Sequence, residues 1–206
     1  MNTLTDYLIF LPAILIAITF HEYAHGWVAY VLGDDTPRLQ GRLTINPLPH
    51  IDWVGFFMLL IFHFGWAKPV QINPNNFKNV SFKQGMMLVS LAGPGMNMLL
   101  ALLGLILIRL LIPFHGSEGF DIALQLLEPL VTINIILAAF NLIPLPPLDG
   151  SKILAGLLPD VGTRFIYALE QYGVVILLLL IMTGLASKIF LPVAGFLYQV
   201  LYALVF

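Results

Sequence analysis

Five long apolar runs restrict this chain more than any other feature of its sequence. They cover residues 7–33, 86–114, 122–143, 165–186 and 189–206, and each has the length expected of a helix that crosses a bilayer. The whole chain of 206 residues is 59% hydrophobic and 10% charged, with a mean hydropathy of +0.93. These values argue against an ordinary soluble domain. The sequence therefore predicts an all-α polytopic membrane protein with about five to six transmembrane segments.

A shorter apolar stretch, at residues 54–66, is not long enough to span comfortably. Its two glycines and the following Pro69 favour a re-entrant hairpin or a partly inserted loop. Before it, residues 33–37 end the first helix, and residues 38–53 are predicted to form short strands or turns. We therefore expect a small β element and a re-entrant loop after the first helix.

Basic residues fall mostly on one side of the predicted spans. Placing the loop at residues 34–53 in the cytoplasm puts seven of them on that side and only Arg109 and Lys188 on the other. By the positive-inside rule the N-terminus then lies outside and the first helix runs inward. The seven are Arg38, Arg42, Lys68, Lys78, Lys83, Lys152 and Arg164. No basic tract suits a nucleic acid, so no nucleic-acid partner is expected.

The first apolar segment carries an HExxH motif, in which His21 and His25 flank Glu22. On a helix the two histidines lie about 40° apart and one turn along, so their side chains point into one site. Two imidazoles at this spacing can bind one Zn²⁺, and Glu22 can take a proton from a water on that metal. The alternative is a pair of helix-face histidines satisfied by neighbours, but burying them with a carboxylate in an apolar helix is costly. The motif thus indicates metal-assisted hydrolysis.

A catalytic zinc site normally has three protein ligands, so a third must come from elsewhere in the chain. The chain has no cysteine, which restricts the candidates to His50, His63, His115 and the acidic residues. Asp149 follows a segment with three prolines in four residues, which prevents a regular helix and could aim its carboxylate inward. The alternative is an ordinary N-cap for a helix that starts at Gly150 or Ser151. These residues alone leave the two interpretations of Asp149 equal.

Together the motifs resemble those of the site-2 protease family of intramembrane zinc metalloproteases. The resemblance rests on the HExxH motif, an NxxPxxPLDG motif at residues 141–150, a GPxxN motif at residues 93–97 and the loop at residues 64–70. It implies that Asp149 is the third ligand of one Zn²⁺. It further implies a single intramembrane metalloprotease domain over residues 1–206, with a catalytic core at about 15–155 and C-terminal helices at about 163–206. No PDZ-like or nucleotide-sensing domain is expected.

The resemblance also implies an activity, namely hydrolysis of peptide bonds within or near transmembrane segments, with Glu22 as the general base. An amide could stabilise the oxyanion, and the candidates are Asn141 and Asn97. The resemblance favours Asn141, although this residue could instead form a helix-to-helix hydrogen bond, and Asn97 could simply pack closely. Unwound substrate could pair with the edge of the segment at residues 65–70. Phe64 and Trp66 could equally be an interfacial anchor beside Lys68.

Several expectations about partners and location follow from this interpretation. The substrates would be single-pass membrane proteins or membrane-retained peptide remnants, cleaved in the lipid bilayer of a prokaryotic inner or plasma membrane with the active site toward the cytoplasm. A homo-oligomer is possible. The alternative function is a non-proteolytic metal-binding membrane scaffold or a transporter. A transporter would spread ionisable groups across both leaflets, whereas this chain concentrates them near one side.

Overall fold

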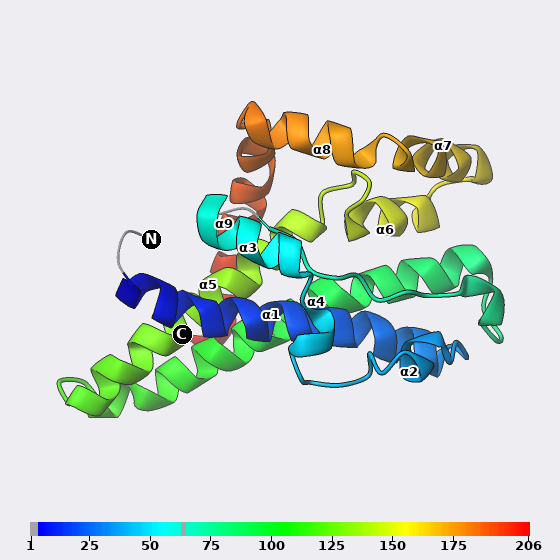
Figure 1. The fold of residues 1–206 in the computed structure, drawn as a ribbon. Helices are drawn as coiled ribbons and strands as arrows, with labels where there is room; N and C mark the ends of the chain where they lie inside the picture. The colour runs from blue at the N-terminus through cyan, green and yellow to red at the C-terminus, as the bar shows by residue number, and fades with distance from the viewer. Residues whose placement is uncertain (1–3, 63–64) are drawn as a thin grey trace.

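The computed structural model describes residues 4–62 and 65–206, which are mainly helical (Figure 1). Five helical segments are long and apolar enough to cross a membrane, namely Ile9–Val31, Phe82–Phe114, Glu118–Asn141, Asp160–Met182 and Leu185–Val205. They coincide with the five predicted spans, and the all-α class is confirmed. The helices are α1 (Leu4–Val31), α2 (Thr36–Leu39), α3 (Trp53–Phe62), α4 (Phe82–Leu111), α5 (Glu118–Asn141), α6 (Asp149–Leu157), α7 (Asp160–Glu170), α8 (Gly173–Met182) and α9 (Leu185–Val205).

Helices α1, α4 and α5 pack together as the central bundle, with α4 antiparallel to both of its neighbours (Figure 1). Close approach of α4 to α5 depends on Gly104, because a Cβ there would lie 2.6 Å from Cγ2 of Val131. The buried cluster beside this contact also includes residues of α9. Its members are Ala101, Leu105, Val131, Ile135, Ala139, Ala194, Leu201 and Val205.

Local signals in the sequence explain where the bundle helices begin. Ser81 and Gln84 form a capping box at the start of α4, in which the Ser81 hydroxyl accepts the Gln84 N–H at 3.2 Å. Ser117 caps α5 by accepting the Phe120 N–H at 3.2 Å. Between α8 and α9, Gly184 adopts φ +70°, a left-handed conformation that suits a residue without Cβ.

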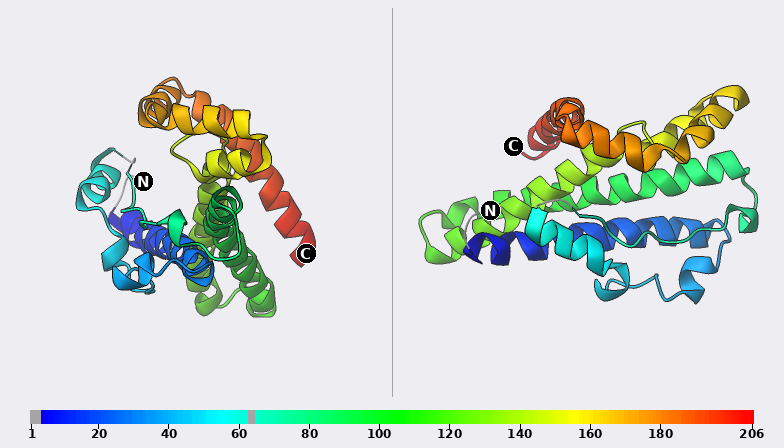
Figure 2. Two further views of the ribbon diagram at one scale, coloured as in Figure 1. Left: turned by 90° about the vertical axis from the view of Figure 1, so that its right-hand side faces the viewer. Right: turned by 45° about the horizontal axis from the view of Figure 1, so that its top comes forward.

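The fourth candidate span is broken into α7 and α8 at Gln171 and Tyr172. These two helices stand away from α1, as both views of Figure 2 show. The start of α8 rests on the loop that precedes α6, because a Cβ on Gly173 would lie 2.7 Å from the carbonyl of Pro146. Through this contact the C-terminal helices support the segment that carries Asp149.

The expected small β element is not formed as strands in the described part of the chain. An isolated antiparallel bridge between Ile51 and Ala67 stands in its place, so this detail of the prediction was wrong. Pro47 and Pro49 explain the difference, because they lack the N–H donors of a ladder and the segment forms a 3₁₀ turn at Leu48–His50. The hairpin shape of the next segment is present, since Gly65 packs on Gly55 so closely that a Cβ on Gly65 would lie 2.2 Å from the Gly55 oxygen.

Asp34 joins the end of α1 to the segment that leads into α4. Its buried carboxylate accepts the Thr36 hydroxyl at 2.6 Å, the Asn73 N–H at 2.6 Å and the Asn76 amide at 2.8 Å. Burial by itself would raise the pKa of Asp34, but these hydrogen bonds outweigh it and hold the pKa below its usual value. The carboxylate is therefore ionised in the folded protein at neutral pH.

We predict that Asp34→Asn destabilises the protein by about 1–3 kcal/mol, because an amide NH₂ would face the Asn73 N–H. The matched control is Asp35→Asn, which loses an exposed pair with Arg38 and should change stability by no more than about 0.5 kcal/mol. Thermal unfolding in detergent measures both.

The same comparison has an expected pH dependence. Since the folded-state pKa of Asp34 is lowered, its stabilisation is complete above the unfolded-state pKa of about 3.9 and is lost as the pH falls through the folded value. The difference between wild type and Asp34→Asn should therefore shrink only in strong acid. Equal stability of the wild type and Asp34→Asn at pH 7 would contradict this role.

Candidate metal centre

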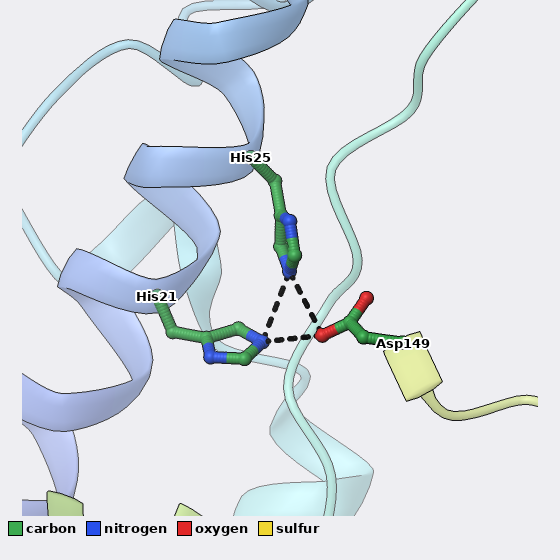
Figure 3. Close-up of side chains that lie close together, drawn as sticks. All are labelled: His21, His25 and Asp149. Atoms are coloured by element: carbon green, nitrogen blue, oxygen red, sulfur yellow. Dashed lines mark hydrogen bonds and ion pairs between the residues drawn. The ribbon is translucent and has the colours of Figure 1, made fainter. Parts of the chain in front are cut away.

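The side chains of His21, His25 and Asp149, which are far apart in the sequence, meet at one point (Figure 3). Nε2 of His21 lies 3.0 Å from Nε2 of His25, and Oδ2 of Asp149 lies 3.2 Å and 3.3 Å from these two nitrogens. Both histidines are buried on α1, and Asp149 is the first residue of α6. The structure thus brings together the three residues predicted to bind the metal.

The proline-rich loop before α6 explains how Asp149 reaches the histidines. Leu148 takes the N-cap position, without a side-chain capping hydrogen bond, and α6 begins at Asp149 itself. The helix start lies against the loop backbone, because a Cβ on Gly150 would come within 2.4 Å of the carbonyl oxygens of Leu142 and Ile143. Asp149 is therefore not the N-cap of a helix that starts one or two residues later, which was the alternative interpretation.

Hydrogen bonds to the far side of each ring fix the tautomers of both histidines. Nδ1 of His25 lies 2.7 Å from the carbonyl oxygen of Val89, which can only accept, so this nitrogen carries the proton. Nδ1 of His21 lies 2.6 Å from Oδ1 of Asn97 and donates in the same way. Each imidazole consequently presents the lone pair of Nε2 to the common centre, as metal-ligating histidines do.

Asn97 is a positioning residue for His21. Its amide nitrogen donates to the Ala17 carbonyl at 3.1 Å and to Oδ1 of Asn134 at 2.8 Å, which leaves Oδ1 to accept from His21. Both asparagines are fully buried. The structure therefore directs the amide of Asn97 into the bundle. Asn134 is absent from the sequence-based site, although a polar residue in the middle of an apolar span was a signal for it.

The donor set fits a zinc ion. Ligand atoms about 2.0–2.1 Å from a tetrahedral zinc ion lie about 3.3–3.4 Å apart, close to the separations of these three atoms. Without a cation the arrangement is unfavourable, because two imidazole lone pairs and a carboxylate oxygen face one another. Among the described residues, Oδ2 of Asp149 is a buried oxygen with no hydrogen-bond donor. His21, His25 and Asp149 therefore have the chemistry and spacing of a three-ligand metal site.

Helix α4 supplies the wall on which the two imidazoles rest. At Gly93 a Cβ would lie 2.4 Å from Nε2 of His25 and 2.6 Å from Cε1 of His21, so any other residue would push the rings away. The glycine of the GPxxN motif thus has a geometric role that its sequence did not indicate. Two residues along, a Cβ on Gly95 would meet no atom within 4 Å.

Glu22 is held by the segment that follows the α3 hairpin. The N–H of Val70 donates to Oε2 of Glu22 at 2.9 Å, and the buried Arg42 donates to the carbonyl oxygens of Lys68 and Pro69 in the same segment. His50 accepts from Arg42 and donates to the Thr44 carbonyl at 2.9 Å. Burial and the Arg42 charge lower the pKa of His50, which is a neutral loop residue.

A cavity of about 360 Å³ opens beside the metal centre. Glu22 and Asn141 line it, and so does Lys152, a cation that the sequence-based site did not include. Nδ2 of Asn141 donates to the Leu137 carbonyl at 3.0 Å, which leaves its second N–H for another acceptor. His50 and His115 do not belong to the metal cluster, and His63 lies outside the described residues.

Comparison with known proteins identifies the class. Residues 114–184, which include Asp149, match the model of peptidase family M50. The chain is 39% identical over 183 residues to "Putative zinc metalloprotease YwhC" of Bacillus subtilis, across 87% of this chain and 82% of that protein. It is 29% identical over 191 residues to "Putative zinc metalloprotease Rip2" of Mycobacterium tuberculosis, across 90% and 71%. No solved structure matches significantly.

These findings make the protein a zinc metalloprotease with several membrane helices. The chain belongs to peptidase family M50, the site-2 protease family, and both of these relatives are bacterial. The resemblance seen in the sequence motifs is thereby confirmed.

We predict that Gly93→Ala lowers zinc affinity by at least about tenfold, because the added methyl group displaces both imidazoles from their positions against α4. Gly95→Ala is the matched control, since it adds the same group to the same helix in open space and should retain zinc. Metal analysis of the purified proteins, followed by competition with a chelator, measures the difference. Wild-type affinity in Gly93→Ala would show that the rings do not need this contact.

Proposed function

We propose that this protein is an intramembrane protease that hydrolyses peptide bonds within or near transmembrane segments. Its substrates would be single-pass membrane proteins or membrane-retained peptide remnants. The observation that carries the proposal is the position of the donor set, whose two histidines lie on a helix long and apolar enough to span a membrane, beside a cavity that Glu22 also lines. Family membership supplies the peptidase chemistry, and the position of the site suggests where it acts.

The distribution of charge supports an active site toward the cytoplasm of the bacterial inner or plasma membrane. The loops at residues 32–81 and 142–159 lie on the same side of the candidate spans and carry most of the basic residues. Under the positive-inside rule this side is cytoplasmic. His25 lies six residues before the end of α1, about 9 Å along the helix axis, so the site would be shallow enough for water to enter from that side.

The residues of the chain divide the catalytic work. One zinc ion, held by His21, His25 and Asp149, would act as a Lewis acid on the peptide carbonyl and lower the pKa of water to about 7. Val70 fixes one oxygen of Glu22, which leaves Oε1 to take a proton from the attacking water and pass it to the leaving amine. The remaining N–H of Asn141 is the donor best placed to stabilise negative charge on the carbonyl oxygen, because Asn97 has both N–H groups engaged.

A peptide bond in a helix is covered by its neighbours and hydrogen-bonded internally, so the substrate must unwind before cleavage. Ala67 offers an edge for the unwound strand. It forms the antiparallel bridge with Ile51. The inter-strand hydrogen bond beside this pair runs from the Lys68 N–H to the His50 carbonyl at 3.0 Å, so Ala67 and Ile51 are a non-hydrogen-bonded pair. In such a pair each residue turns its own N–H and C=O away from the other strand. Among the described residues no hydrogen bond engages these groups, and Ala67 lines the cavity. Substrate would therefore add as a strand beside Ala67.

We predict that Glu22→Gln retains zinc and lowers the cleavage rate by about 10²–10⁴-fold, because an amide still accepts from Val70 but cannot take a proton. Asp149→Asn should lose zinc affinity, since it replaces a ligand carboxylate. The measurement is zinc content together with cleavage of a single-pass substrate in liposomes. A wild type that holds zinc yet cuts none of several single-pass substrates would favour the scaffold or transporter function.

A second prediction distinguishes the roles of Asn141 and Asn97. Asn141→Ala should keep zinc and lose about 10²–10³-fold in kcat, whereas Asn97→Ala should lose about 10–100-fold in zinc affinity because His21 loses its acceptor. Zinc titration and steady-state kinetics on both variants distinguish the roles. Normal zinc affinity in Asn97→Ala combined with slow cleavage would transfer the oxyanion role to Asn97.

A further inference from the structure

A second cavity, of about 240 Å³, adjoins the metal-site cavity. Its walls include Leu15 and Ile18 on α1, Phe56 and Leu59 on α3, and Ile133 and Ile136 on α5, together with the segments at residues 47–52 and 65–67. Ala67, Leu137 and Phe140 are among the residues that line both cavities. The second cavity therefore shares a wall with the site.

The titratable residues around this second cavity, His50 and Asp52, already have partners. The ring nitrogens of His50 are engaged by Arg42 and by the Thr44 carbonyl. Oδ1 of Asp52 accepts the Gly55 N–H at 2.9 Å at the start of α3. The remaining walls are mostly aliphatic or aromatic. A charged occupant would lose its hydration without a compensating partner, so the cavity suits an apolar group.

Its position fits the substrate path. Leu15 precedes His21 by six residues on α1, which corresponds to about 9 Å along the helix axis. An extended substrate strand covers this distance with about three residues. Ala67, the edge to which the substrate strand would pair, lies at the junction of the two cavities. With α1 running from outside inward, the second cavity lies on the side of the metal centre that is deeper in the membrane.

We propose that the second cavity is a specificity subsite, which takes one large aliphatic or aromatic side chain of the substrate, about three residues from the cut bond on its deeper side. This inference rests on the proposed protease function. The volume is smaller than the roughly 300–1,000 Å³ of pockets for whole ligands and suits one side chain. Alternating side chains of a strand paired at Ala67 would place every second residue on the face toward this cavity.

The experiment uses the full chain in liposomes and a single-pass substrate whose cut bond has been located by mass spectrometry. Ala, Leu, Phe or Asp is placed in turn at each of the four positions on either side of the bond. We expect Leu and Phe to be preferred over Ala by about tenfold or more in kcat/KM at one position, about three residues from the bond, and Asp to be rejected there.

Ile133→Phe tests the assignment to this cavity, because it fills the α5 wall. It should lower the ratio of kcat/KM for Phe to that for Ala by about tenfold at the same position. Leu126→Phe is the matched control, since it makes a similar change on an exposed position of α5, and it should keep the wild-type ratio. Zinc content, measured on both variants, reports whether the metal centre is intact.

The outcomes separate the subsite from the protease function. Equal cleavage of every substrate, or a preference that Ile133→Phe leaves unchanged, overturns the subsite alone. Loss of a co-purifying lipid in Ile133→Phe with an unchanged preference would make the cavity a lipid site and also overturn it. A zinc-loaded wild type that cuts none of the substrates overturns the protease function, and the subsite with it.

Discussion

The convergence of two imidazole nitrogens and one carboxylate oxygen is the constraint on which the rest of the structure depends. These atoms lie 3.0–3.3 Å apart with no donor among them, an arrangement that is stable only with a cation in the centre. Hydrogen bonds from the surrounding protein fix the orientation of the two imidazole rings. Val89 and Asn97 hold the far sides of the rings, and the proline-rich loop holds Asp149. The metal affinity of the site is therefore distributed over residues that do not touch the metal.

Helix α4 provides no metal ligand, yet it forms the back of the site. The carbonyl of Val89, the missing side chain of Gly93 and the amide of Asn97 all come from this one helix. They occur at intervals of four residues, so they lie along one face, and that face is pressed against α1. A change in the rotation of α4 by one residue, about 100°, would remove all three contacts at once. The geometry of the metal centre consequently depends on how α4 packs on α1.

The sequence predicted the spans and the HExxH pair because both depend on local spacing. The pairing of Asp149 with residues more than a hundred positions earlier was left open by the residues and followed only from the family resemblance. The contacts of Gly93, Asn134 and Arg42 could not be predicted, since they depend on how helices and loops are packed. The prediction of a β element was wrong because Pro47 and Pro49 lack the N–H donors of a ladder, and the segment forms a 3₁₀ turn instead.

The order of the ligands along the chain also has a consequence for synthesis in the cell. His21 and His25 belong to the first candidate span, whereas Asp149 follows the third. A chain inserted into the membrane from its N-terminus therefore carries an incomplete donor set until most of it has left the ribosome. Until then the three residues that could hold a metal ion are not together, so the metal centre is assembled only after most of the bundle has been made.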